Sequence, residues 1–217
     1  MLNEGMNDYL KRVFTFFGLV ALVPFGLGFT SSWAPGLSFL LFILALPAAL
    51  LALAGGGILW FVRGLRLAGP QTNHWNKMTL LGVAPLLLAC TVLVSWPLLA
   101  SGSFLGSLSR LFVNHGQYEA IIAKARVERR PVWFEDQGGV IYSVDLGPPV
   151  RVAFNPAGML DNWSGIIYDP TGEVMLAKGF DPHTGKFAAP DRITKLFDGD
   201  LVGCRHLWAD YYDCSFT

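Results

Sequence analysis

Two long stretches without an ionisable side chain constrain this chain of 217 residues more than any other feature. Residues 13–62 and residues 78–109 contain no Asp, Glu, Lys, Arg or His over 50 and 32 consecutive positions. A helix needs about 20 apolar residues to cross a bilayer core, so the first stretch suffices for two crossings and the second for one. We therefore predict three transmembrane helices, at about residues 13–33, 37–62 and 78–99, and we exclude an ordinary soluble enzyme.

The rest of the chain is long enough for one small folded domain. We expect a membrane domain over residues 1–106 and a separate domain over residues 107–217. The first apolar segment follows Lys11 and Arg12, as the core of a signal peptide does, but it exceeds about 15 residues and no small-x-small cleavage site follows it cleanly. We interpret it as a retained helix, with cleavage as the alternative.

The distribution of Lys and Arg predicts how the spans are oriented. Lys11 and Arg12 precede the first span, and the loop of residues 63–77 carries three basic residues and no acidic one. Short cytoplasmic loops are enriched in Lys and Arg, so both segments are expected to face the cytoplasm. Three crossings then place residues 107–217 on the opposite side. We predict a multi-pass protein of the bacterial inner membrane, with a cytoplasmic N-terminus and a periplasmic C-terminal domain.

The predicted spans favour helix packing over transport. Pumps and ion-coupled transporters place ionisable groups at membrane depth, and the predicted spans contain none. Ala48, Ala52 and Gly56 recur at four-residue spacing, and such a ridge lets helix backbones approach closely. Two interpretations stay open: the ridge packs on the other helices of this chain, or it receives a transmembrane helix of a partner. Membrane lipid surrounds the spans in both.

The C-terminal part combines one helical pattern with several short strand-like runs. Residues 107–126 place apolar side chains, Phe112 among them, on one face, which predicts an amphipathic helix that ends at Pro131. Strands are predicted at residues 132–134, 140–144, 150–154, 163–168 and 173–177 and in two runs near the C-terminus. The segment Asp169-Pro170-Thr171-Gly172 is typical of a hairpin turn. The predicted fold is a membrane protein with three transmembrane α-helices followed by a small α+β domain, in which one helix packs on an antiparallel sheet of about five to seven strands.

Two of the three cysteines are placed to form a disulfide. Cys204 and Cys214 lie on either side of Ala209, so an antiparallel hairpin centred on Ala209 would place them opposite each other. Disulfides persist in exported domains. We predict this bond together with the periplasmic location, and the alternative of two free thiols would place the domain in the cytoplasm. Cys90 lies in the third span and is predicted to be a packing residue.

The sequence carries no recognisable catalytic, metal or cofactor motif. It has no Gly-x-Ser-x-Gly elbow and no phosphate-binding Gly-rich loop. Asp181 with His183 and Cys204 with His206 are the only close pairs of metal ligands, and neither has a second pair at a zinc-site spacing. The first 109 residues hold five basic and two acidic side chains and the rest hold 11 and 14, so neither part predicts nucleic-acid binding. We predict no catalytic residues, metal, cofactor or nucleic-acid partner; a membrane-tethered hydrolase centred on His183 or His206 is the alternative.

The C-terminal hairpin combines aromatic and acidic side chains. Tyr and Trp offer large contact areas at small entropic cost and are enriched in protein interfaces. The predicted partner-binding residues are His206, Trp208, Asp210, Tyr211, Tyr212 and Asp213. Residues 161–217 hold nine acidic and five basic side chains, so we expect a basic protein partner. The alternative is that half of the aromatic rings face the sheet core and the aspartates keep the edge soluble.

In size and plan the chain resembles the small inner-membrane immunity proteins that protect bacteria from interbacterial toxins. The resemblance lies in three short uncharged spans followed by one compact outer domain without an assembled active site. The chain is similar to the immunity partner of a pore-forming effector of the type VI secretion system. This resemblance implies a non-catalytic protein that captures the toxin before it opens a pore. The alternative is an accessory or assembly subunit of a larger envelope complex, in which Ala48, Ala52 and Gly56 pack on another subunit.

Overall fold

The computed structural model describes residues 2–37, 40–159 and 162–217. The chain divides into two compact units, Met1–Ser103 and Phe104–Thr217, which we call the helical unit and the C-terminal domain. The helical unit consists of apolar helices, the C-terminal domain contains a β-sheet, and one long helix contributes residues to both.

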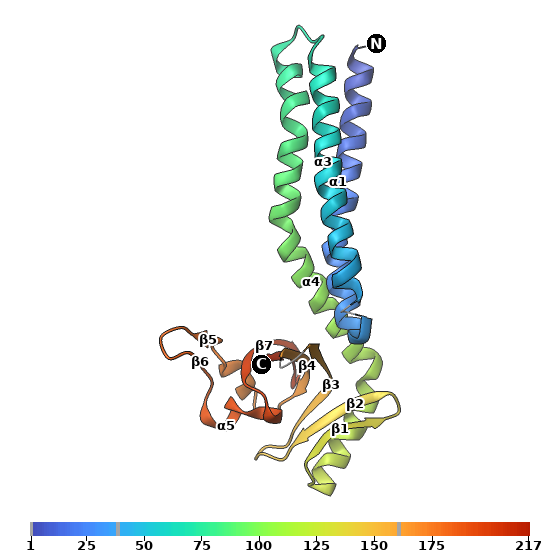
Figure 1. Cartoon of the computed structure of the whole chain (residues 1–217). Helices are drawn as coiled ribbons and strands as arrows, with labels where there is room; N and C mark the ends of the chain where they lie inside the picture. The colour runs from blue at the N-terminus through green and yellow to red at the C-terminus, as the bar shows by residue number, and fades with distance from the viewer. Residues whose placement is uncertain (1, 38–39, 160–161) are drawn as a thin grey trace. The chain divides into compact units, whose positions relative to one another are not determined.

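Three long apolar helices dominate the N-terminal half of the chain (Figure 1). They are α1 (Leu2–Trp33), α3 (Leu46–Ala68) and α4 (His74–Glu128), with a 3-10 turn η1 (Pro35–Leu37) and a π-helical turn η2 (Leu41–Ala45) between the first two. By length and composition, all three are able to cross a membrane. The prediction of three long apolar helices is confirmed, although α3 begins only after the π-helical turn.

The third apolar stretch and the amphipathic segment after it form a single helix. We predicted a span that ends near Leu99 and a separate helix over residues 107–126, but α4 continues without a break from His74 to Glu128. The sequence between the two segments contains Gly and Ser but no proline, so nothing stops the helix there. It ends at Glu128, ahead of the predicted stop, because Arg129 adopts a left-handed conformation with φ 45°.

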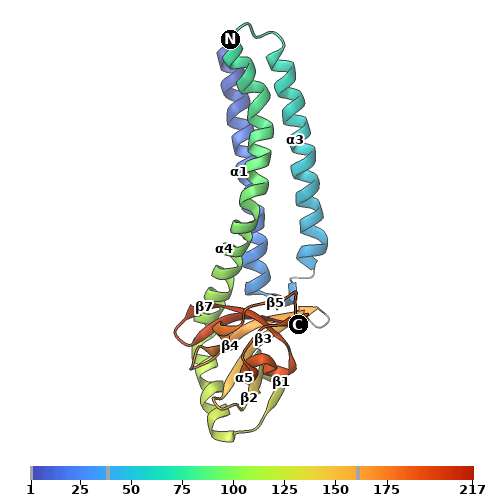
Figure 2. The same ribbon diagram turned by 90° about the vertical axis from the view of Figure 1, so that its left-hand side faces the viewer.

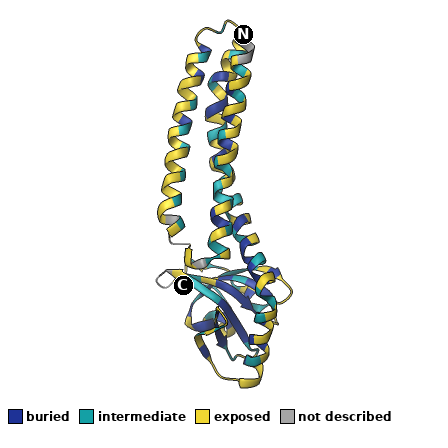
Figure 3. Ribbon diagram, turned by 90° about the vertical axis from the view of Figure 1, so that its right-hand side faces the viewer, coloured by how far each residue is buried: buried dark blue, intermediate teal, exposed yellow. Residues whose placement is uncertain are grey.

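The helical unit buries one side of its helices and exposes the other. Its buried core consists of Tyr9, Val13, Phe17, Ala68, Leu80, Val83 and Ala84. The hydroxyl of Tyr9 donates a hydrogen bond to the carbonyl oxygen of Trp60 over 3.0 Å, which links α1 to α3. The remaining faces carry exposed Leu, Ile, Val and Trp side chains (Figure 3). The helices therefore present an apolar outer surface.

Two glycines allow α1 and α4 to pack backbone to backbone. A Cβ atom added at Gly28 would lie 2.1 Å from the carbonyl oxygen of Leu99. One added at Gly102 would lie 2.1 Å from the carbonyl oxygen of Phe25. Real Cβ atoms do not approach backbone atoms this closely, so a larger residue at either position must push the helices apart. Small residues at helix contacts permit such an approach.

The predicted ridge of small residues is only partly used within this unit. Gly56 packs against α1, where an added Cβ atom would lie 2.0 Å from the ring of Phe16. Ala48 and Ala52 are exposed. Packing within the chain is therefore seen at Gly56 alone of the three, and the other two members of the ridge stay uncovered by α1 and α4.

The C-terminal domain is built on a six-stranded antiparallel sheet. Its strands are β1 (Val132–Gln137), β2 (Val140–Asp145), β3 (Arg151–Met159), β4 (Asn162–Tyr168), β7 (Leu201–Trp208) and β8 (Tyr211–Phe216). The spatial order is β1-β2-β3-β4-β8-β7, so the first four form a meander and the C-terminal hairpin adds β8 beside β4. A separate ribbon pairs β5 (Phe180–Asp181) with β6 (Lys186–Phe187). The predicted antiparallel sheet of five to seven strands is confirmed.

Both faces of the sheet are covered. The C-terminal part of α4 lies on one face (Figure 2), where Tyr118 and Ile122 share a buried cluster with Val152 and Phe154 of β3. On the other face lie the short helices η3 (Glu173–Leu176), α5 (Asp191–Thr194) and η4 (Leu196–Asp198), which supply a second buried cluster. The prediction of one helix packed on the sheet is confirmed for α4, and the cover on the second face was not foreseen.

The segment after β4 forms a turn that does not lead into a second strand. At the predicted turn of residues 169–172, the backbone N–H of Gly172 donates to the carbonyl oxygen of Asp169 over 3.3 Å, and Gly172 has φ 68°. The predicted strand over residues 173–177 is wrong, because this segment forms η3. The buried carboxylate of Asp169 lies 3.1 Å from Arg151 Nε and accepts the backbone N–H of Val174 over 3.0 Å. These bonds hold the start of η3, and the next residues do not pair with β4 because β3 and β8 occupy its two edges.

Candidate partner-binding surface

A disulfide closes the C-terminal hairpin of β7 and β8. Cys204 and Cys214 are paired directly across the two strands, with a Cα–Cα distance of 4.1 Å, and their sulfur atoms are bonded. The predicted bond is therefore confirmed. The turn begins at Ala209, and a register shift between His206 and Trp208 moves the pairing by one residue. A hairpin centred on Ala209 consequently predicts the cysteine pair correctly but not the pairing next to the turn.

Removal of this disulfide is expected to destabilise the C-terminal domain by about 2–3 kcal/mol, because the bond restricts the unfolded chain. Denaturant unfolding in detergent, monitored by tryptophan fluorescence, would compare the double variant Cys204→Ser/Cys214→Ser with the parent. Cys90→Ser is the matched control, since Cys90 is a free cysteine in the helical unit. A difference below about 1 kcal/mol between the parent and the double variant would contradict a stabilising role.

Two of the predicted partner-binding residues are core residues. Tyr211 and Tyr212 are only 2 % and 8 % exposed, so the prediction that their rings contact a partner needs correction. Successive strand residues point to opposite faces, and both faces of this sheet are covered, so neither ring reaches the surface. The hydroxyl of Tyr211 donates to Glu119 Oε1 over 2.6 Å. Burial and this hydrogen bond to a carboxylate raise the pKa of Tyr211.

Asp213 belongs to a polar cluster that joins the hairpin to α4. Its Oδ2 accepts hydrogen bonds from Arg205 Nη2 over 2.6 Å and from the Ser107 hydroxyl over 3.1 Å. The buried side chain of Arg110 also interacts electrostatically with Asp213. Because these groups occupy the Asp213 carboxylate, its predicted role in binding a partner is also corrected to a structural one.

The other three predicted residues do lie at the surface. His206, Trp208 and Asp210 are exposed. A ring nitrogen of His206 lies 2.7 Å from the carbonyl oxygen of Ala209, which fixes the imidazole against the turn. The hairpin therefore offers one large aromatic ring, one carboxylate and one anchored imidazole to solvent.

Trp208 forms part of a larger apolar surface with residues of α4. Its ring centroid lies 5.6 Å from that of Phe112 and 5.3 Å from that of His115. Phe112 is 53 % exposed. We call Phe112, His115 and Trp208 the aromatic patch. The prediction that Phe112 faces the sheet is wrong, because successive helix residues are about 100° apart and Leu111 takes the buried position instead.

The residues considered for metal or hydrolytic chemistry do not form a cluster. Across residues 2–37, 40–159 and 162–217, no group of three or more His, Cys, Asp and Glu side chains could hold a metal ion. The disulfide occupies the sulfur of Cys204, next to His206. The Asp181 carboxylate accepts the backbone N–H of His183 over 2.8 Å, so this pair stabilises a turn. That hydrogen bond lowers the pKa of Asp181.

Comparisons with family models, with curated proteins and with solved structures give no match for this chain. Its function is therefore inferred from its own geometry. The informative features are the apolar helices, the disulfide-closed hairpin and the aromatic patch.

Proposed function

We propose that this protein is anchored in the bacterial inner membrane by α1, α3 and α4. The uncharged stretches and the apolar outer faces of the helices support insertion. Lys11, Arg12 and the basic residues of the loop 63–77 support a cytoplasmic location for the N-terminus and for that loop. The C-terminal domain then lies in the periplasm, a compartment where its disulfide would persist.

The aromatic patch is the observation that carries a binding function. Its rings come from two different elements, α4 and β7, and the hairpin that contains Trp208 is closed by the disulfide. Exposed aromatic side chains on rigid elements form the energetic centres of many protein interfaces, because they bury area at little entropic cost. The exposed carboxylate of Asp210 lies close to Trp208 in the turn and favours a basic partner. The C-terminal domain accordingly binds a protein and catalyses no reaction.

The partner that fits this arrangement best is a membrane-acting toxin of an interbacterial secretion system. The resemblance of the chain to small immunity proteins supports this assignment. A binding domain tethered to the outer surface of the inner membrane meets such a toxin where it must insert. Capture of the toxin at that surface prevents the opening of a pore.

A second candidate function is that of an accessory or assembly subunit of a larger envelope complex. The exposed positions of Ala48 and Ala52 on α3 favour it. A helix from another subunit would be able to approach α3 closely along this ridge, because small side chains leave room for its backbone.

The loss of one partner on mutation of the aromatic patch would test the binding function. We expect a tagged chain, purified in detergent from its own host, to carry one stoichiometric protein that mass spectrometry identifies. Trp208→Ser should reduce its recovery by about tenfold or more, as expected for an interface centre. Val127→Ser is the matched control, because Val127 is an exposed apolar residue of α4, the helix that carries Phe112, and lies outside the patch.

Two other results separate the candidates. A multi-subunit complex that survives Trp208→Ser but is lost in Ala52→Leu would favour the accessory role. If neither substitution changes which proteins are recovered, both candidate functions are contradicted. This conclusion requires that thermal unfolding shows both variants to be folded.

A further inference from the structure

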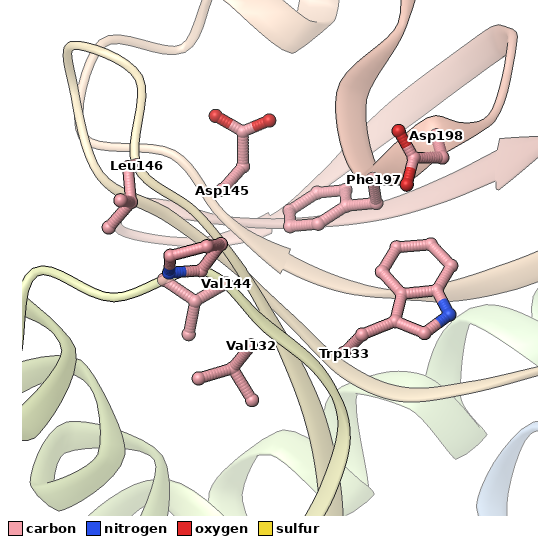
Figure 4. Close-up of a pocket in the computed structure, with 8 residues that line it drawn as sticks. Val132, Trp133, Val144, Asp145, Leu146, Phe197 and Asp198 are labelled. Carbon is pink, nitrogen blue, oxygen red and sulfur yellow. The ribbon is translucent and has the colours of Figure 1, made fainter.

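A pocket of about 380 Å³ lies in the C-terminal domain, where β1, the end of β2 and η4 meet (Figure 4). Its volume falls in the range of small-molecule binding sites. Two aromatic rings, Trp133 and Phe197, and two carboxylates, Asp145 and Asp198, line it together with aliphatic side chains from β1 and β2. No residue of the aromatic patch belongs to this lining.

An irregularity in β1 places Trp133 at this pocket. The pairing of β1 with β2 shifts register between Val132 and Glu135, and Phe134 adopts φ 50° within the irregular segment. Trp133 is 53 % exposed, whereas Phe197 is buried in the cluster on the second face of the sheet. The phenyl ring therefore forms the inner side of the pocket, and the indole ring is accessible to a ligand from solvent.

The two carboxylates give the pocket a negative charge, and no Lys, Arg or His is among its lining residues. Arg151 lies opposite Asp145 in the pairing of β2 with β3, but its guanidinium pairs with Asp169 and Glu173. Arg130 pairs with Glu128 and Glu135, and Lys195 pairs with Asp200. Asp145 uses Oδ1 to accept the backbone N–H of Gly147, which leaves its second oxygen for a ligand.

We propose that this pocket binds a small aliphatic ammonium compound. An ammonium group donates hydrogen bonds to the carboxylates of Asp145 and Asp198, which also balance its charge, and the methylene chain of such a ligand lies against the aliphatic wall. The face of the Trp133 indole adds a cation–π contact, for which indole is the best of the side-chain rings. Ca²⁺ or Mg²⁺ fits less well, because these ions prefer six or more oxygen ligands and an apolar wall supplies none.

Calorimetric titration of the full chain tests the proposal, in nanodiscs of zwitterionic phosphatidylcholine that do not attract the ligand themselves. The probe is putrescine, a four-carbon diamine, and its neutral analogue 1,4-butanediol is the control ligand. We expect putrescine to bind and the diol to bind at least tenfold more weakly. Empty nanodiscs and a calcium titration complete the set of controls.

Three variants locate the site. Asp145→Asn keeps the acceptor for Gly147, and Asp198→Asn suits the left-handed conformation at this position, φ 55°, because asparagine tolerates it well. Each of these, and Trp133→Leu at the half-exposed ring, should weaken putrescine binding by about tenfold or more. Asp191→Asn removes one exposed charge outside the pocket and should leave binding unchanged.

The proposal is overturned if putrescine does not bind or if it binds equally to all four variants. It is also overturned if calcium binding is weakened by the three pocket substitutions while putrescine binding is not. It concerns a site separate from the aromatic patch, so failure of the proposed protein-binding function would leave it standing. Equal thermal unfolding of the variants and the parent would establish that the losses arise at the site.

Discussion

Replacement of Asp169 by alanine is expected to destabilise the C-terminal domain by about 3–5 kcal/mol, the usual cost of removing one partner from a buried ion pair. Asp169 and Arg151 are 0 % and 1 % exposed, and 3.1 Å separates Oδ1 of Asp169 from Nε of Arg151. Without the carboxylate of Asp169, the buried guanidinium keeps only the partly exposed Glu173 as a counter-charge, 3.0 Å from its Nη2. The backbone N–H of Val174 loses its acceptor as well, so η3 loses the bond that begins it.

Denaturant unfolding of the full chain in detergent would measure this loss. Asp191→Ala is the matched control, because Asp191 is an exposed aspartate of α5, one of the short helices that cover the second face of the sheet. We expect it to change the free energy of unfolding by less than about 0.5 kcal/mol. Asp169→Asn should fall between the two, since the amide oxygen keeps an acceptor but removes the charge. A loss below about 1 kcal/mol in Asp169→Ala would mean that the pair does not hold this segment in place.

Substitution of Gly102 by leucine is the second change with a large expected effect. The new Cβ atom would lie 2.1 Å from the carbonyl oxygen of Phe25, which is backbone and cannot move alone. The helices α1 and α4 must therefore separate, at a cost of about 1–3 kcal/mol or more, as overpacking produces elsewhere. Gly28→Leu should act in the same way from the other helix, because its contact with Leu99 is equally short.

Disulfide crosslinking between the two helices would report this separation. The hydroxyl oxygens of Ser32 and Ser103 lie 2.7 Å apart, so cysteines at both positions should crosslink readily in the parent. We expect the yield to fall strongly in Gly102→Leu. It should be unchanged in Gly82→Leu, where an added Cβ atom meets nothing within 4 Å. Equal yields in the two variants would show that α1 and α4 do not cross at these glycines.

The long helices and the disulfide could be predicted from the sequence because local features determine them. Uncharged stretches of 50 and 32 residues leave few alternatives to long apolar helices. Cys204 and Cys214 lie symmetrically about Ala209, so a tight hairpin is enough to pair them. Neither inference requires knowledge of how distant segments pack.

The glycine contact, the buried ion pair and the choice of which hairpin rings are buried could not be predicted because they depend on such packing. Gly28 and Gly102 matter only because α1 and α4 cross at these residues, and a single sequence does not reveal the crossing point. Asp169 in a turn sequence gives no sign that Arg151 lies beside it. Tyr212 is buried because η3, α5 and η4 cover the second face of the sheet. The predicted strand over residues 173–177 gave no cover for that face, so it left Tyr212 exposed.

The aromatic patch contains one residue that the sequence singled out and others that depend on the packing of distant segments. Trp208 could be singled out from the composition of the hairpin, and it is indeed exposed. Phe112 and His115 lie in the predicted helix of residues 107–126, which was expected to pack on the sheet. That they meet Trp208 of β7 depends on where this helix crosses the sheet, and a single sequence does not reveal that position.

Labelling of single cysteines in intact cells decides whether the C-terminal domain is exported. In a Cys90→Ala background, one variant would carry His183→Cys in the exposed loop between β5 and β6, and another Thr72→Cys in the exposed loop between α3 and α4. A membrane-impermeant maleimide should label the first variant in spheroplasts, whose cytoplasm stays sealed, and the second only after lysis. The reverse pattern would place the C-terminal domain in the cytoplasm and contradict both its export and the proposed encounter with a toxin at the outer surface.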